Sequence, residues 1–355
     1  MQRTYFLGGA SPAGFVTSFW EAHRSYHGYY LKGGPGTGKS TLMKKTAAAF
    51  AGEHVSCWHC ASDPHSLDAV VLENRGIFLA DATAPHEANT PLPFVTGETV
   101  DLAAGLSSAP LRTHAPEILR LYRENQAAHQ QARKGIAGIA EFEAIIAEIG
   151  SRALDTQKLR GFAARLGRRL IPKNAGARGE IRRRQSMALT PAGRVRYLPE
   201  DFDLILVHDP MRVGSAMLLQ SLAEYAADCG AVCEVTQELT RPDFPPVTVI
   251  LPQQHLTVAA VTGSAPPDLP SPVSCIRMQR FYGAEILRKH RSLIRFCSKT
   301  AAHTEQTVIS LLADALRIHD ELETYYISAL DPAFLDQTAA RIIAEIGAAS
   351  PADCT

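Results

Sequence analysis

Two spacings of apolar residues alternate along the first eighty positions of this chain. Short apolar runs at 29–31 and 77–80 are typical of buried β-strands. Between them, from Leu42 to Phe50, apolar residues recur every three or four positions, as they do on one face of a helix. The pattern predicts a strand, a loop, a helix and a later strand, which is the element order of an α/β domain.

Longer helical patterns follow these strands. Apolar residues recur at spacings of three and four over 116–149, over 156–170 and over 278–326. Gly135 and Gly138 predict a break or bend in the first of these helices. We expect these helices to be insertions that act as a lid or as a surface between domains.

The loop before the first predicted helix carries a phosphate-binding motif. Residues 33–40 match G-x-x-x-x-G-K-[ST]. Glycines let backbone N–H groups turn towards phosphate oxygens, Lys39 can reach the β- and γ-phosphates, and the Ser40 hydroxyl can ligate Mg²⁺. A strand before the loop and a helix after it supply the context that this chemistry needs. The predicted nucleotide-binding residues are Gly33, Gly34, Pro35, Gly36, Thr37, Gly38, Lys39, Ser40 and Thr41.

A carboxylate partner for the Mg²⁺ ion is expected at the end of a later strand. Asp81 ends the apolar run at 77–80, which places it at the C-terminal edge of the sheet, beside the loop. We predict that Ser40 and Asp81 hold the ion and that Lys39 and Asp81 take part in catalysis. The next residue is Ala82, so the acidic base that many motor ATPases place there is absent.

A second group of polar residues follows the strand predicted at 54–61. Asp63 is a candidate catalytic residue that orients a water or an acceptor hydroxyl, with Asp68, His65 and His86 on the same edge. The alternative for Asp63 is turn formation before Pro64. For the two histidines we favour solvated side chains.

The second half of the sequence repeats the first. Residues 31–43 align with 207–219 and residues 77–83 align with 256–262. The repeat carries Ser215 at the position of Lys39, Ala216 at that of Ser40 and Ala260 at that of Asp81. We predict two duplicated P-loop NTPase-like domains, over 1–175 and 180–350, each a mostly parallel sheet flanked by helices. The second domain is degenerate, so only the first binds Mg-nucleotide well.

These motifs together resemble a family of bacterial tandem, duplicated P-loop ATPases. The segments that carry the resemblance are 3–15, 31–45, 59–68, 81–86 and 319–326. The resemblance implies ATP binding and a cytoplasmic bacterial setting. Members of the family can carry a second P-loop in the C-terminal half, and this sequence departs from that pattern at Ser215 and Ala216.

Composition narrows the class of protein. A chain of 355 residues with 46% hydrophobic residues can form about two domains with sizeable cores. No run approaches the roughly 20 apolar residues of a membrane span, and the first residues lack a signal-peptide pattern, so we expect a soluble, cytoplasmic protein with no membrane partner. Seven cysteines favour reduced thiols over a disulfide framework.

Charge is balanced over the whole chain but not locally. From Arg152 to Arg196 there are thirteen lysines and arginines against two acidic residues, Asp155 and Glu180. This stretch can bind nucleic acid through its phosphates or an acidic protein. Alternatively it is a solvated linker surface, or one arginine serves the nucleotide of the first half.

Three function classes stay open from the sequence. The first is a Mg²⁺-dependent ATPase with ATP bound in the N-terminal half. The second is a small-molecule or nucleoside kinase that uses Asp63 as its base. The third is a nucleotide-gated switch or a nucleic-acid-associated protein without significant turnover.

Overall fold

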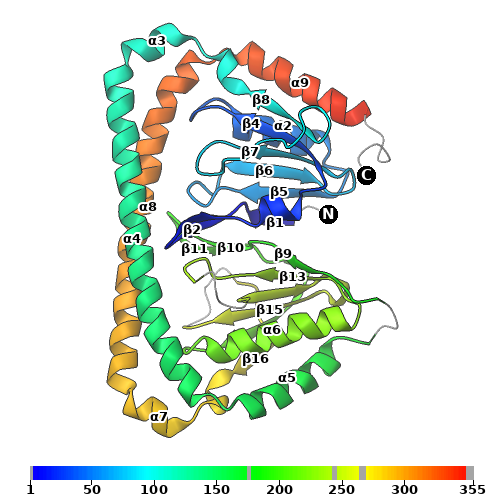
Figure 1. The fold of residues 1–355 in the computed structure, drawn as a ribbon, viewed down its shortest axis with the longest axis vertical. Coiled ribbons are helices and arrows are strands. Elements are labelled where there is room, and N and C mark those ends of the chain that lie inside the picture. Colours follow the sequence, from blue (N-terminus) through cyan, green and yellow to red (C-terminus); the bar gives the residue numbers. More distant parts are fainter. Residues whose placement is uncertain (1–2, 174–176, 242–245, 264–268, 349–355) are drawn as a thin grey trace. The chain divides into compact units, whose positions relative to one another are not determined.

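Two six-stranded sheets form the framework of the protein. The structure is a computed structural model that describes residues 3–173, 177–241, 246–263 and 269–348. The chain is α/β, and each sheet is mixed and flanked by helices (Figure 1). The first sheet contains β1 (Arg3–Phe6), β4 (His27–Lys32), β5 (Val55–His59), β6 (Leu67–Leu72), β7 (Ile77–Asp81) and β8 (Gly97–Asp101).

The strand order of the first sheet is β1-β5-β6-β7-β4-β8. Only β6 runs antiparallel to its neighbours β5 and β7, and the other pairs are parallel. The reason lies in the connections: the links on either side of β6 are too short for a parallel crossover, so each forms a hairpin. The expected mostly parallel sheet is therefore a mixed sheet with one reversed strand.

The second sheet has the same topology. Its order is β9-β13-β14-β15-β12-β16, and only β14 is reversed. The ladder register pairs Leu31 with Asp81 in the first sheet and Val207 with Ala260 in the second, which supports the alignment of Asp81 with Ala260. The strands are β9 (Ile181–Arg183), β12 (Asp203–His208), β13 (Cys233–Thr236), β14 (Thr248–Leu251), β15 (Leu256–Val261) and β16 (Ser274–Arg277).

The principal helices of the second sequence half follow the same order as those of the first. The principal helices of the two halves are α2 (Lys39–Ala49), α4 (Ala115–Ala153), α5 (Thr156–Leu170), α6 (Val213–Asp228), α8 (Arg291–Ala329) and α9 (Pro332–Ala348). The prediction of a helix over 156–170 is confirmed, and Asp155 caps it by accepting a hydrogen bond from the Lys158 N–H at 2.9 Å. The helix predicted over 116–149 continues through Gly135 and Gly138 as part of α4.

The helix predicted over 278–326 is wrong in its bounds. That stretch contains the short helices η3 (Met278–Phe281) and α7 (Ala284–Lys289) before α8 begins at Arg291. Other short elements are β2 (Gly9–Ser11), β3 (Gly14–Val16), α1 (Phe19–Ala22), η1 (Leu102–Gly105), α3 (Ser108–Thr113), β10 (Met187–Thr190), β11 (Gly193–Arg196) and η2 (Pro252–Gln254). Among the helices of the described residues, none is long and apolar enough to cross a bilayer.

The chain divides into two compact units that differ from the sequence halves 1–175 and 180–350. Unit 1 combines Met1–Arg133, Leu189–Val195 and Val308–Thr355, and unit 2 combines Lys134–Ala188 and Arg196–Thr307. Unit 1 holds the first sheet and unit 2 holds the second.

The last helix of each sequence half packs in the unit that contains the sheet of the other half. In unit 1, α9 packs Leu335 and Ile342 into the core that contains Leu42 of α2. In unit 2, α5 packs Leu159 and Leu166 into the core formed with α6. This exchange explains why compact units and duplicated halves are different divisions of the chain.

Candidate functional site

The predicted phosphate-binding residues lie where β4 ends and α2 begins, in a segment that we call the first loop (33–38). Gly38 is the N-cap of α2 and has φ +85°, a left-handed conformation that favours glycine. A Cβ atom at Gly38 would also lie 2.5 Å from Cδ2 of Leu335 in α9. Both the backbone and the packing therefore require glycine here.

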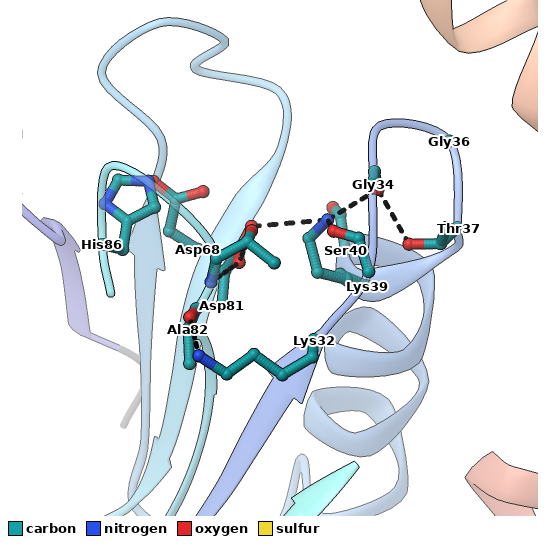
Figure 2. Close-up of polar contacts among 12 residues, drawn as sticks. Lys32, Gly34, Gly36, Thr37, Lys39, Ser40, Asp68, Asp81, Ala82 and His86 are labelled. Carbon is teal, nitrogen blue, oxygen red and sulfur yellow. Dashed lines mark hydrogen bonds and ion pairs between the residues drawn. The ribbon is translucent and has the colours of Figure 1, made fainter. Parts of the chain in front are cut away.

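Lys39 turns back onto the first loop. Its Nζ donates hydrogen bonds to the carbonyl oxygens of Gly33 and Gly34, both at 2.8 Å, and lies 3.7 Å from Oδ2 of Asp81 (Figure 2). The side chains of Lys39 and Asp81 are 13% and 14% exposed, so the ion pair is only partly solvated. Sequence reasoning placed these two groups in one site, and the structure brings them together.

Asp81 reaches the loop because of the strand register. It is the last residue of β7, and its partner in the ladder is Leu31 of β4, two residues before the loop begins. Its Oδ1 accepts hydrogen bonds from the N–H of Thr83, at 2.8 Å, and from the Thr83 hydroxyl. These two bonds fix the carboxylate, and Oδ2 stays directed at Lys39.

Ser40 lies in the first turn of α2, and its Oγ accepts a hydrogen bond from the Leu67 N–H at 3.0 Å. Ser40 and Asp81 supply hydroxyl and carboxylate oxygens, the hard donors that Mg²⁺ prefers. Within the described ranges there is no cluster of three or more His, Cys, Asp or Glu suited to a metal ion. A Mg²⁺ ion held by Ser40 and Asp81 would complete its coordination with phosphate and water oxygens, as Mg²⁺ commonly does.

A buried acid–histidine pair lies beside Asp81. Oδ2 of Asp68, on β6, is 3.4 Å from Nε2 of His86, and both side chains are 9% exposed. Burial raises the pKa of Asp68 to about 6, with a further increase from Asp81 that His86 opposes. The interpretation of His86 as a solvated side chain is therefore wrong: the ring packs edge-on against Phe15, with centroids 4.4 Å apart. No hydrogen-bond partner for its Nδ1 is found in the described part of the chain.

Asp63 lies in the turn between β5 and β6. Its Oδ1 accepts a hydrogen bond from the His65 N–H at 3.0 Å, and its carbonyl accepts one from the Ser66 N–H at 2.9 Å. Both contacts form a turn, which is the alternative that the sequence left open for Asp63. Its charge also contributes to the raised pKa of Asp320 in α8, after the larger effect of burial.

Helix α8 contacts the first loop, a feature that the strand and loop patterns did not predict. Oε1 of Glu323 accepts a hydrogen bond from the Gly36 N–H at 3.0 Å and lies 3.3 Å from Nε2 of His319. The Tyr326 ring would lie 3.3 Å from a Cβ at Gly34. Residues 319, 323 and 326 are spaced by four and three, so they share one helix face, and this spacing is the signal that the sequence did contain.

The equivalent second loop (209–212) in unit 2 is filled by the side chains of Asp209, in the loop, and Tyr282, which comes from elsewhere in the unit. Oδ2 of Asp209 accepts a hydrogen bond from the Ser215 N–H at 2.7 Å, and Oδ1 accepts one from the Met211 N–H at 3.1 Å. The Tyr282 hydroxyl lies within 3.0 Å of both carboxylate oxygens and accepts a hydrogen bond from the Gly214 N–H at 2.7 Å. Asp209 is fully buried.

The basic stretch from Arg152 to Arg196 does not form one uniform surface. Arg184 is buried, and Arg178 pairs with Glu224 and Asp228. Four exposed arginines of α5 make no ion pair among the residues that the structure describes: Arg160, Arg165, Arg168 and Arg169. Residues 174–176, which belong to this basic stretch, lie outside the described residues.

Cys57 and Cys60 stand at Cys-x-x-Cys spacing, in the first sheet and just after one of its strands. Cys57 is buried on β5, whereas Cys60 follows the end of that strand. Burial raises the pKa of the Cys60 thiol, and the charge of Asp68 raises it further. Neither cysteine forms a disulfide bond within the described residues.

Comparisons with protein-family models, with curated proteins and with solved structures find no match to this chain.

Proposed function

We propose that unit 1 is a P-loop NTPase-like domain that binds Mg-ATP at residues 33–41 and hydrolyses it. The observation that supports this most directly is the position of Lys39, whose ammonium group lies between two loop carbonyls and the Asp81 carboxylate. A phosphate-binding lysine requires such a position, because it can exchange these oxygen partners for phosphate oxygens with little movement.

The first loop would receive the triphosphate through its backbone N–H groups and the positive end of α2. Lys39 would then pair with the β- and γ-phosphates, while Ser40 and Asp81 hold the Mg²⁺ ion. When bound, the ion neutralises charge that develops on the phosphate oxygens. Asp81 keeps its orientation through Thr83.

Asp68 is more deeply buried than Asp63, and this makes it the better candidate for the proton acceptor. Two carboxylates with separated pKa values can divide the roles of base and metal ligand, and burial raises the pKa of Asp68 to about 6. In this proposal Asp68 takes the proton of the attacking water and Asp81 binds the ion. His86 orients Asp68 through their contact at 3.4 Å.

Unit 2 is proposed not to bind nucleotide. The N–H groups of Gly214 and Ser215 already have acceptors in Tyr282 and Asp209. A phosphate would have to displace a buried carboxylate, and Ser215 and Ala216 supply neither the lysine nor the hydroxyl of the motif. The substitutions and the filled loop support the same conclusion.

The exposed arginines of α5 favour nucleic acid as a second binding partner. Four exposed cations on the 15-residue helix α5 can contact phosphates of a nucleic-acid backbone. Such binding would weaken steeply with salt and would need no base recognition.

The test is turnover of [γ-³²P]ATP with Mg²⁺, with Lys39→Ala as the blank and Ser215→Ala as the matched control at the equivalent position. Free phosphate above the blank is expected, and stimulation by single-stranded or duplex nucleic acid would assign the α5 arginines a role. Label transferred to an organic acceptor would instead indicate a kinase. Binding without turnover would indicate a nucleotide-gated switch.

A further inference from the structure

We propose that Glu323 of α8 occupies part of the phosphate site and that the nucleotide must displace it, so that α8 is an autoinhibitory element of the first loop. This inference rests on the proposed function of unit 1. It adds a residue outside the motif that sets nucleotide affinity.

The contact places a carboxylate on an amide that belongs to the motif. Oε1 of Glu323 lies 3.0 Å from the N–H of Gly36, the central glycine of the first loop. His319, one turn earlier, lies 3.3 Å from the same oxygen. The hydrogen bond from His319 is the largest of the effects that lower the pKa of Glu323. Glu323 is therefore a stable anion at this position.

The packing shows that the loop and α8 fit one another closely. A Cβ at Gly36 would lie 2.8 Å from the backbone oxygen of Glu323 and 3.1 Å from atoms of Tyr326 and Ile327. Gly36 also has φ +67°, in the left-handed region. The absence of a side chain at Gly36 is what lets α8 approach the loop backbone.

A carboxylate and a phosphate compete at such an amide for two reasons. One N–H group has a single proton to donate, so only one oxygen can take a full-strength hydrogen bond. Two anions a few ångströms apart also repel one another in a partly desolvated site, where screening by water is weak. The nucleotide therefore binds best after Glu323 has moved away.

Unit 2 offers an internal comparison for a carboxylate as a ligand of such a loop. Asp209 accepts hydrogen bonds from Met211 and Ser215 and is fully buried, so its loop is filled permanently. Glu323 holds its loop with one backbone hydrogen bond, and its side chain is 35% exposed. The contact in unit 1 is therefore the releasable form of the arrangement in unit 2.

The experiment measures the dissociation constant of a fluorescent ATP analogue with Mg²⁺ for four full-length proteins. These are the wild type, Glu323→Gln, Glu321→Gln and Lys39→Ala. Glu321 is the matched control, because it lies on the same helix and is exposed, and it forms only a weak pair with Arg317 at 4.0 Å. Glu323→Gln keeps the shape of the side chain and removes its charge.

We expect Glu323→Gln to bind the analogue about five- to tenfold more tightly than the wild type, as expected from the loss of one close like-charge interaction. Glu321→Gln should match the wild type. The rise in melting temperature caused by Mg-ATP should also be larger for Glu323→Gln, because the nucleotide no longer displaces an anion.

Equal or weaker binding by Glu323→Gln would overturn the inference, since Glu323 would then be neutral or a ligand of the nucleotide. If the wild type binds and Lys39→Ala does not, such a result leaves the proposed function intact. Absence of binding in all four proteins would instead contradict the proposed function itself, and the inference with it.

Discussion

The two loops of this protein lie at equivalent places, after β4 and after β12, and differ in what fills them. In unit 1 the loop at 33–38 lies next to Lys39, Ser40 and Asp81, and Glu323 of α8 accepts a hydrogen bond from its Gly36 N–H. In unit 2 the loop at 209–212 is closed by Asp209 and Tyr282. In unit 2 the buried N–H groups of the loop have acceptors from the protein itself, so the fold there needs no bound anion.

The long helices α8 and α4 contact equivalent positions of the two loops in different ways. Residue 36 in unit 1 is a glycine whose N–H meets Glu323 of α8. Its equivalent in unit 2 is Arg212, which pairs with Glu143 of α4 at 2.6 Å, and the Glu143 side chain is only 3% exposed. A buried ion pair costs several kcal/mol to break by removing one partner, so the unit 2 contact is a fixed one.

The largest expected effect comes from the lysine of the first loop. Lys39→Ala should lower ATP turnover by about a thousandfold or more, because the γ-phosphate loses its main cation. Ser215→Ala should leave turnover unchanged, since Ser215 lies in the filled loop and its hydroxyl only donates to the Arg212 carbonyl at 3.0 Å. Steady-state phosphate release measures both. Equal losses would show that the two loops have not diverged in function.

The next effect concerns Asp68. Replacement by Asn should lower turnover by about a hundredfold or more if the carboxylate accepts the proton of water. In the wild type, turnover should fall as the pH drops through about 6, where Asp68 becomes protonated. In Asp68→Asn the residual turnover should no longer depend on pH in this range. Asp63→Asn, the matched change in the neighbouring turn, should keep the wild-type profile. If the pH dependence of turnover is lost in Asp63→Asn instead, Asp63 is the base, as in the kinase alternative.

The same residue also predicts how stability depends on pH. The pKa of Asp68 is raised in the folded state, so the folded chain binds this proton more tightly than the unfolded chain does. Its contribution to the free energy of unfolding should therefore decrease as the pH rises from about 4 to about 6, by up to about 3 kcal/mol. Urea unfolding of the wild type and Asp68→Asn over this range tests the sign. If the free energy of unfolding of the wild type rises with pH relative to that of Asp68→Asn, the prediction is contradicted.

An effect of similar size on stability is expected in unit 2. Asp209→Ala should reduce the free energy of unfolding by about 2–4 kcal/mol, because it leaves the buried Tyr282 hydroxyl and two N–H groups without their acceptor. Asp203→Ala, an exposed change on β12, is the control and should cost little. Denaturant unfolding followed by circular dichroism measures both. Similar values for the two variants would show that Asp209 does not hold the loop together.

Local pattern was enough to place the motif, but not its surroundings. Residues 33–41 and Asp81 are adjacent to strands whose spacing is plain in the sequence, and parallel strand ends meet at one edge. The reversal of β6 follows from short connections, which the sequence contains around 60–66 and 73–76. The lengths of these two connections therefore predict the hairpins that reverse β6.

Other features depend on contacts between distant segments. The stripes of α5 and α9 specify an apolar face but not the sheet that the face covers, and so the exchange of these helices could not be deduced. The contact of Glu323 with Gly36 joins residues 287 positions apart. His86 was misjudged because nothing in its neighbours shows that Asp68 and Phe15 bury it.

We propose that the first loop binds nucleotide and that the second loop, filled by Asp209 and Tyr282, does not. Titration calorimetry with Mg²⁺ and a non-hydrolysable ATP analogue tests it most directly, on the wild type, Lys39→Ala and Ser215→Ala. We expect one nucleotide per chain for the wild type and for Ser215→Ala, and none for Lys39→Ala. Two nucleotides per chain, or one that survives Lys39→Ala, would contradict it.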